Sequence, residues 1–494
     1  MLTINKKLFK ALQKANIQYC HWKSNEHLKA GLQGKTDLDI LIAKNTSTSA
    51  KTILQKSGFQ LFSGPDTMEY KGLEHWIGMD AETKQLSHIH LHDYLRLGQK
   101  HLKGYILPWE SLLLNTATND PATNITIADP NLELILLLTR SALKIRCRDY
   151  PLFFLGQIYF SKDDKREFNW LQQRSNKEKL RKYAQKVLGK KAAQHIVSLK
   201  PSLFSLTKLR RIIKPRLHSH KQHNLIDATL QSWKRELIWI THKINQRYFH
   251  QPTTAGLRVG KKGKVIACIG TDGSGKSTIT NELTKWLSWK FNPIPIYFGS
   301  GQGTISLLRL PLKLLASIFT SNSSGNIEKV YKQEKANSTS PLHAIKKVGL
   351  ITWALLLARE KRIKLKKMIK ARNRGMIIIC DRFPQKNIQY LSDGPLLMDH
   401  LQSKSSIMKK LARWEFKTYE LAFNNAPDLV LRLNVSPNIA VKRKSDITLN
   451  ELQTKSNTLK TLQYGKSTKI VDIDANMPLQ EVINKAKNTL WKEI

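Results

Sequence analysis

The feature that most constrains the fold is a glycine-rich segment in the second half of the chain. An apolar run from Val265 to Ile269 leads into Gly270-Thr-Asp-Gly-Ser-Gly-Lys-Ser277, and a segment with helical apolar spacing follows. The segment fits the pattern G-x-x-x-x-G-K-[ST] at every position. The order strand, loop and helix is what a phosphate-binding loop requires, because the helix N-terminus attracts an anion. The alternative is a glycine-rich turn before a helix.

The residue types in this loop suit a nucleotide and a divalent cation. Glycines let the backbone bend so that several N–H groups face phosphate oxygens. We expect Lys276 to reach the β- and γ-phosphates and the Ser277 hydroxyl to bind Mg²⁺, so ATP and Mg²⁺ are the predicted cofactors. The expected cofactor-binding residues are Gly270, Asp272, Gly273, Ser274, Gly275, Lys276, Ser277 and Thr278.

A second strand is predicted to end beside this loop. Residues 376–380 are apolar and lead into Asp381 and Arg382. In open α/β sheets, ligands bind at the carboxyl ends of the parallel strands, so an acidic residue at this place lies near the phosphates. We expect Asp381 to hold Mg²⁺ through water or to orient an acceptor, and Arg382 to hold a phosphate. A capping aspartate with a surface arginine is the alternative.

Sequence patterns divide the 494-residue chain into three predicted domains. Residues 1–129 combine strand and helix patterns and predict an α+β domain. Residues 130–256 form a basic helical region, which begins after the N-cap Asp129 with Pro130 at the first helical position and ends in a linker of small residues. In residues 257–494 strands alternate with helices, which predicts right-handed crossovers and a parallel, doubly wound α/β sheet.

The first predicted domain contains carboxylates on one strand. Asp37 and Asp39 lie two residues apart on an extended segment, so both point to one face and their apolar neighbours to the other. That spacing suits a shared divalent cation, and a solvated polar strand face is the alternative. A later segment alternates His88, His90 and His92, which indicates either a transition-metal site or a half-exposed strand.

The charge of the chain predicts attraction to polyanions. There are 82 Lys and Arg against 37 Asp and Glu, a formal net charge of +45. This excess suits nucleic acid, an anionic membrane surface or phosphorylated substrates without choosing among them. The four cysteines form no C-x-x-C pair, and the start of the chain lacks the apolar core of a signal peptide. We therefore expect a cytoplasmic protein, with peripheral attachment to the inner membrane face as an option.

The order of motifs across residues 257–494 resembles thymidylate kinase. The shared features are the phosphate loop with an acidic residue at Asp272, an apolar strand that ends in Asp381 and Arg382, and a later apolar strand followed by basic residues. The resemblance implies transfer of the ATP γ-phosphoryl group to an acceptor. It departs at Tyr297–Gly303, where the Arg-Glu-Pro-Gly-Gly-Thr segment of thymidylate kinases is missing, so the acceptor stays open.

The same resemblance assigns roles to residues around the acceptor. It implies that Asp272 contacts an acceptor sugar, and that Arg359 or Arg362 holds the acceptor phosphate. Because Gly273 stands where other members have an arginine, catalytic help is expected from the basic segment around Arg443. That segment consists of Lys442, Arg443 and Lys444. The expected catalytic residues are Lys276, Asp381, Arg382 and Arg443.

The segment from Lys23 to Asp39 resembles the nucleotidyltransferase superfamily, in which a Gly-Ser turn precedes an Asp-x-Asp strand. The resemblance implies an N-terminal nucleotidyltransferase-like domain with Asp37 and Asp39 as metal ligands. It departs twice, because the turn here is Lys23-Ser24 and histidines stand where a third carboxylate is expected. Chains that join such a front to a kinase-like back resemble proteins of bacterial surface-polysaccharide functions.

We therefore predict an ATP-dependent P-loop kinase of the thymidylate or nucleoside monophosphate kinase type. The alternatives are a kinase acting on a sugar or glycolipid in surface-polysaccharide metabolism, a nucleotidyltransferase that uses the first domain, a nucleic-acid-modifying protein and a nucleotide-gated switch. The expected partners are a nucleotide and an anionic small molecule or saccharide. An anionic membrane or nucleic acid is a further option through the basic regions, and the oligomeric state is not predicted.

Overall fold

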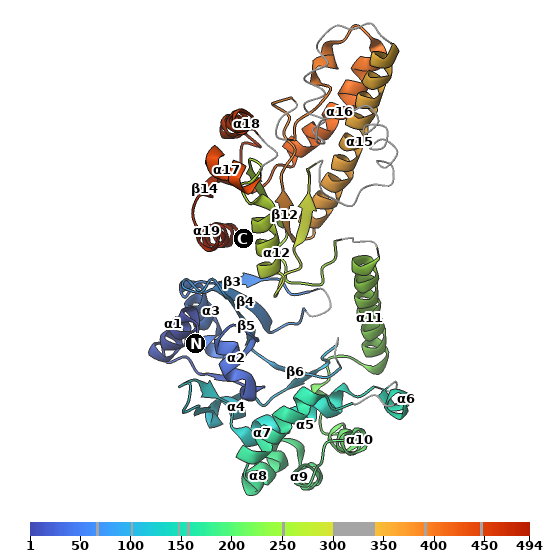
Figure 1. Ribbon diagram of the computed structural model, residues 1–494. Helices are drawn as coiled ribbons and strands as arrows, with labels where there is room; N and C mark the ends of the chain where they lie inside the picture. Colours follow the sequence, from blue (N-terminus) through green and yellow to red (C-terminus); the bar gives the residue numbers. More distant parts are fainter. Residues whose placement is uncertain are drawn as a thin grey trace. The chain divides into compact units, whose positions relative to one another are not determined.

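The computed structural model has two compact units, Met1–Ile244 and Asn245–Ile494 (Figure 1). The described residues are 1–65, 69–99, 102–146, 149–155, 159–248, 252–299, 341–389, 393–444 and 448–494. Each unit combines helices with its own sheet, so the predicted mixed α/β class is confirmed. Residues 300–303 of the segment that departs from the thymidylate kinase pattern lie outside the described residues.

The second unit is built on a parallel five-stranded sheet. Its strands are β10 (Lys264–Gly270), β11 (Ile294–Tyr297), β12 (Ile377–Asp381), β13 (Leu429–Asn434) and β14 (Lys469–Asp474). They lie in the order β11-β12-β10-β13-β14, and each neighbouring pair is parallel. The strand before the phosphate loop is therefore central, and its register places Cys268 opposite Asp381. The parallel sheet predicted for this region is confirmed.

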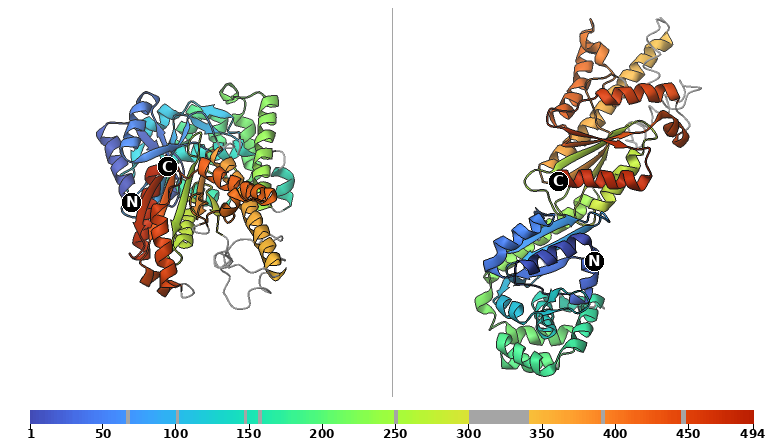
Figure 2. Two further views of the ribbon diagram at one scale, coloured as in Figure 1. Left: turned by 90° about the horizontal axis from the view of Figure 1, so that it is seen from above. Right: turned by 90° about the vertical axis from the view of Figure 1, so that its left-hand side faces the viewer.

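Helices cover both faces of this sheet (Figures 1 and 2). They are α12 (Lys276–Leu287), α15 (Pro341–Arg372), η5 (Met398–Gln402), α16 (Ser406–Asn424), α17 (Pro437–Arg443), α18 (Leu449–Thr461) and α19 (Leu479–Glu493). Both α12 and α15 pack on β10, β11 and β12, but α12 also contacts α19 whereas α15 contacts α16. Alternate residues of β10 point to opposite faces of the sheet. Val265 and Ala267 share a core with Leu365 of α15, and Ile266 and Cys268 are buried on the other face.

The first unit contains a mixed seven-stranded sheet in the order β3-β4-β5-β2-β1-β9-β8. Its strands are β1 (Tyr19–His21), β2 (Leu38–Ile42), β3 (Phe59–Phe62), β4 (Leu73–Met79), β5 (Leu86–His92), β8 (Thr118–Asn119) and β9 (Thr126–Ile127); β6 (Leu95–Leu97) and β7 (Tyr105–Leu107) form a separate pair. The central strand β2 runs parallel to β5 and antiparallel to β1, while β5 pairs antiparallel with β4. The Asp-x-Asp segment therefore lies beside the histidine-rich strand.

Three helices, α7, α8 and α10, pack against the apolar helix α5 in the first unit (Figure 1). The described helices of this unit are numbered along the chain. They are α1 (Thr3–Lys14), η1 (Asn25–His27), α2 (Leu28–Leu32), η2 (Lys44–Thr46), α3 (Ser47–Lys56), α4 (Glu110–Thr116), α5 (Pro130–Lys144), α6 (Asp149–Phe154), α7 (Lys162–Arg174), α8 (Lys177–Leu188), α9 (Lys190–Val197), α10 (Leu203–Ile213), η3 (His218–His220) and α11 (Leu225–Arg247). The predicted cap is present, since Asp129 accepts a hydrogen bond from the amide of Asn131 and Pro130 opens the helix. Over the described ranges, no helix has both the length and the apolarity needed to cross a membrane.

Candidate functional site

The phosphate loop joins β10 to α12 through backbone conformations that favour glycine. Gly273 and Gly275 have φ angles of +80° and +86°, in the left-handed region where a side chain is strained. A Cβ on Gly273 would also lie 2.8 Å from the carbonyl oxygen of Ala440 in α17. Gly275 is the N-cap of α12, and no described side chain caps this helix. The loop therefore presents the first N–H groups of α12 to an anion.

The end of β12 brings a carboxylate to the start of α12. The Ser277 hydroxyl donates a hydrogen bond to Asp381 Oδ2 at 2.5 Å. Asp381 is 6% exposed, and its second oxygen, Oδ1, is buried with no hydrogen-bond partner among the described residues. A buried carboxylate oxygen is costly to leave unpaired. A hydroxyl and a carboxylate are oxygen ligands of the kind that Mg²⁺ prefers, so these two residues fit the predicted cation.

Lys276 lies buried in the first turn of α12. Its ammonium donates to the carbonyl oxygen of Thr271 at 2.6 Å, so the side chain folds back over the loop. Burial, together with the neighbouring Arg382, lowers the pKa of Lys276 to about 8. A phosphate oxygen is a stronger acceptor for an ammonium than a peptide carbonyl, so an anion in the loop gives this cation a better partner.

Asp272, in the middle of the loop, is held by two cations. Arg382 Nη2 lies 2.7 Å from Asp272 Oδ1, and Lys455 Nζ lies 3.0 Å from Oδ2. Burial alone raises the pKa of Asp272, but Lys455 and Arg382 hold it well below its usual range. Arg382 also has a φ angle of +68°, a left-handed conformation that costs energy in a residue other than glycine. Its amide donates to the Cys268 carbonyl of β10 at 2.9 Å, which holds it in place.

A small cavity, open to solvent, lies beside this carboxylate. Its lining residues are Ile269, Gly270, Thr271, Asp272, Arg382, Phe383, Asp393, Lys455, Leu459 and Tyr464. The cavity therefore joins an end with two cations, Arg382 and Lys455, and two carboxylates, Asp272 and Asp393, to a wall with the aromatic rings of Phe383 and Tyr464.

The remaining predicted residues lie at different distances from the loop. Arg443 contacts it, because its guanidinium donates to the carbonyl oxygens of Gly273 at 3.5 Å and Ala475 at 3.2 Å. Thr278, Lys442 and Lys444 are all exposed. On α15, Arg359 is exposed and Arg362 is half-buried, and neither side chain has a hydrogen bond or ion pair within the described part of the chain.

Three residues near the cavity are missing from the sequence prediction. Lys455 and Asp393 belong to no recognised motif, so only the folded chain identifies them. Lys361 is 5% exposed and donates to the Asp393 carbonyl oxygen at 3.0 Å. The sequence could have indicated that Lys361 is buried, because it lies four residues from both Leu357 and Leu365, which are buried on the same face of α15.

In the first unit, carboxylates and imidazoles pair on one face of β2 and β5. His88 Nδ1 lies 2.8 Å from Asp37 Oδ1. Asp39 Oδ1 lies 3.2 Å from His90 Nδ1 and 3.2 Å from His92 Nε2. Lys23 Nζ is 2.9 Å from the same oxygen of Asp39. The structure therefore brings the two predicted carboxylates together with all three predicted histidines.

The ionisation of this face is set by burial and by the ion pairs. Burial alone raises the pKa of Asp39, but Lys23, His90 and His92 hold it well below its usual range. Burial lowers the pKa of His92 to about 3. Burial, with the nearby His90, also lowers the pKa of His75 to about 2. His75, on β4, joins the face through strand pairing and was not predicted.

Comparison with known proteins finds relatives over less than half of the chain. No protein-family model matches it. It is similar to the uncharacterized ATP-binding protein YghR of Escherichia coli K12, with 28% identity over 234 residues that cover 46% of this chain and 86% of YghR. It is also similar to the uncharacterized ATP-binding protein YghS of the same strain, with 30% identity over 223 residues that cover 44% of this chain and 89% of YghS. Among solved structures, the chain is similar to deoxyadenosine kinase from M. mycoides with bound dCTP, with 21% identity. The similarity covers 46% of this chain and 98% of the kinase, and the TM-score of 0.24 assigns no function.

Proposed function

The chain belongs to the family of the ATP-binding protein YghS, and from this membership we propose that its second unit is an ATP-dependent P-loop kinase. One observation carries the proposal: Ser277 Oγ and Asp381 Oδ2 lie 2.5 Å apart at the N-terminus of the helix that follows the loop. A glycine-rich structural turn has no need of a buried carboxylate with an unpaired oxygen at this place. A site for a nucleotide phosphate and a divalent cation does need one.

In this proposal the phosphate tail of ATP lies on the loop. The N–H groups at the start of α12 and the ammonium of Lys276 neutralise its charge, with Lys276 exchanging the Thr271 carbonyl for a phosphate oxygen. Ser277 and Asp381 would hold Mg²⁺, which neutralises charge on the β- and γ-phosphates when it is bound. Little covalent chemistry is asked of the protein, because positioning and charge stabilisation carry most of the catalysis.

Arginines from two elements serve the transferred phosphoryl group. Arg382 reaches the loop from the end of β12, and Arg443 reaches it from α17. A guanidinium presents paired donors that match phosphate oxygens, and donors fixed before the reaction stabilise the charge that develops during transfer. The ion pair of Arg382 with Asp272 keeps that guanidinium in place before a nucleotide binds.

We assign the cavity beside Asp272 to the acceptor. Arg382 and Lys455, which pair with Asp272 in the structure, would turn to an anionic group of the acceptor, and the aromatic wall suits a flat ring, as in a nucleoside monophosphate. This acceptor class agrees with the thymidylate kinase-like order of motifs. A sugar phosphate or a lipid-linked saccharide offers the same anionic group without the flat base, so a panel of acceptors separates these classes.

The test is transfer of label from γ-labelled ATP in the presence of Mg²⁺. The acceptors offered are nucleoside monophosphates, sugar phosphates and lipid-linked saccharides, with water as the background acceptor. The wild-type chain is expected to label one acceptor class, and Lys276→Ala is expected to label none while it keeps its circular dichroism spectrum. Release of inorganic phosphate alone would reduce the proposal to an ATPase or a nucleotide-gated switch, and absence of ATP binding would remove the site altogether.

A further inference from the structure

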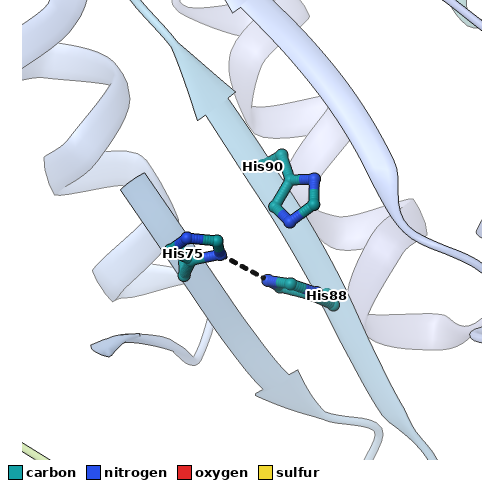
Figure 3. A group of neighbouring side chains, drawn as sticks. All are labelled: His75, His88 and His90. Atoms are coloured by element: carbon teal, nitrogen blue, oxygen red, sulfur yellow. Dashed lines mark hydrogen bonds between the residues drawn. The ribbon is translucent and has the colours of Figure 1, made fainter. Parts of the chain in front are cut away.

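Three imidazoles meet on one face of the sheet in the first unit (Figure 3). His75 lies on β4, and His88 and His90 lie on the antiparallel strand β5, where His90 is directly opposite His75. Because residues two apart on a strand share a face, His88 stands beside His90 on the same side. His75 and His88 are 7% and 3% exposed, so this is not a solvated strand face.

The nitrogens are spaced like the ligands of a metal ion. His75 Nδ1 and His88 Nε2 are 3.2 Å apart, and one nitrogen from each of the three rings lies within 4.8 Å of the other two. In a tetrahedral site with Zn–N distances of about 2.0 Å, two ligand nitrogens lie about 3.3 Å apart. His75 and His88, which share a hydrogen bond at this distance, therefore have the separation of two zinc ligands once the shared proton is released. The ring of His90 lies 4.4 Å from that of His88 between centroids, and its ligand nitrogen is within 4.8 Å of the other two.

Two carboxylates orient two of these rings. Asp37 Oδ1 is 2.8 Å from Nδ1 of His88, and Asp39 Oδ1 is 3.2 Å from Nδ1 of His90. A carboxylate that binds Nδ1–H leaves Nε2 as the lone-pair nitrogen, which is the usual outer shell of a metal-binding histidine. Figure 3 shows the other ring nitrogen of His90 directed toward His88.

A neighbouring group, Asp39, His90 and His92, also comes close enough to share an ion, and it uses the same His90. The carboxylate of this group already forms an ion pair, because the ammonium of Lys23 lies 2.9 Å from Asp39 Oδ1. A cation at that oxygen would be repelled by the ammonium and would have to displace it. The three-histidine group has no such cation within its own ligand set.

We propose that His75, His88 and His90 bind one transition-metal ion, with Zn²⁺ as the best match, and that Asp37 and Asp39 orient His88 and His90. Imidazole suits zinc and its neighbours in the periodic table, whereas Mg²⁺ prefers oxygen ligands. Three protein ligands leave a fourth position open for water or substrate, as in catalytic zinc sites. The site lies in a different unit from the phosphate loop and adds a function to the proposed kinase.

The experiment titrates the full-length, tag-free protein with Co²⁺ after treatment with a chelator, followed by competition with Zn²⁺. One equivalent of Co²⁺ is expected to give the intense visible absorption of a tetrahedral site, and Zn²⁺ is expected to abolish it. His75→Gln and His90→Gln should weaken Zn²⁺ binding at least about 100-fold. Asp37→Asn, which removes only an orienting contact, should weaken it about 10–100-fold.

Two control variants locate the ion. His92→Gln belongs only to the neighbouring group and should keep the absorption, and His218→Gln, an exposed histidine on η3, should behave as wild type. The Tm of the metal-free variants shows whether each one folds. Should His75→Gln fail to fold, Asp37→Asn and His88→Gln carry the test. Absence of a stoichiometric site in the wild type, or loss of binding in His92→Gln with retention in His75→Gln, overturns the proposal.

Discussion

The guanidinium of Arg382 lies 2.7 Å from the carboxylate of Asp272, so the end of β12 is tied to the middle of the phosphate loop. Lys455, from α18, binds the other oxygen of the same carboxylate. One acid therefore fixes two cations beside the place where a phosphate tail would lie. The positions of these donors are set before any ligand arrives, which lowers the reorganisation that binding requires.

The Asp272–Lys455 pair should contribute measurably to the stability of the second unit. Both side chains are mostly buried, at 15% and 19% exposed. We expect a double-mutant cycle of Asp272→Asn and Lys455→Met to give a coupling energy of about 0.5–3 kcal/mol. The measurement is the free energy of unfolding in urea. The unfolding transition that ATP shifts is the one assigned to the second unit. Lys460→Met, an exposed lysine on the same helix, should be additive with Asp272→Asn; equal coupling for both lysines would contradict the specific pair.

Ser277→Ala and Asp381→Asn should lower phosphoryl transfer by similar amounts, about 10²–10³-fold, because each removes one half of the same oxygen pair. Both variants should also need more Mg²⁺ to reach half-maximal rate. The measurement is the rate of label transfer against Mg²⁺ concentration. Thr284→Ala is the control, since its hydroxyl bonds the Thr280 carbonyl within α12 and should leave the rate within about twofold. A normal rate in Asp381→Asn would exclude the assigned role.

Gly273→Ala should destabilise the loop more than Gly260→Ala. Both glycines have positive φ angles, +80° and +58°, so each substitution carries a backbone cost of about 1–3 kcal/mol. A Cβ at Gly273 also meets the Ala440 carbonyl at 2.8 Å, whereas nothing lies within 4 Å of one at Gly260. The difference between the Tm values of the two variants, measured in the unfolding transition that ATP shifts, gives the contribution of this steric clash. ATP affinity should fall only in Gly273→Ala, and equal losses in both variants would count against the geometry of the loop.

ATP binding should weaken as the pH rises through 8. The pKa of Lys276 is lowered to about 8, so its ammonium is mostly charged at pH 7 and mostly neutral at pH 9. Since the charged form binds phosphate, the Kd for ATP should rise above pH 8, approaching about tenfold per pH unit. Calorimetry at pH 7, 8 and 9 at constant ionic strength checks this. Lys276→Met should bind weakly with little pH dependence, and a wild-type Kd that is constant over this range would contradict the role of the ammonium.

Local patterns were sufficient for the phosphate loop and the elements around it. The apolar run before Gly270, the glycines with left-handed backbone and the helix after Lys276 are adjacent in the chain, so short-range physics sets them. The N-cap at Asp129 is local for the same reason. The parallel sheet also followed from sequence, because strands that alternate with helices have few ways to pair.

Contacts between distant segments were beyond the reach of these patterns. Lys455 reaches Asp272 across 183 residues, and nothing near either residue predicts the pair. His75 meets His88 only because β4 turns back along β5 in one register, and a shift by one residue would move the ring to the other face. The neighbours of each histidine on β4 and β5 therefore depend on strand register.

By itself, the order of residues determined that a strand, a glycine loop and a helix follow one another in the second unit, and that Asp37 and Asp39 share one face of a strand. Both results depend on local backbone geometry, which repeats every two residues in a strand and about every 3.6 residues in a helix. Only the tertiary structure decided that Asp381 meets Ser277, that Lys455 joins Asp272 and that three histidines converge. Those contacts depend on which strands pair and in which register, and burial of the whole core selects that arrangement.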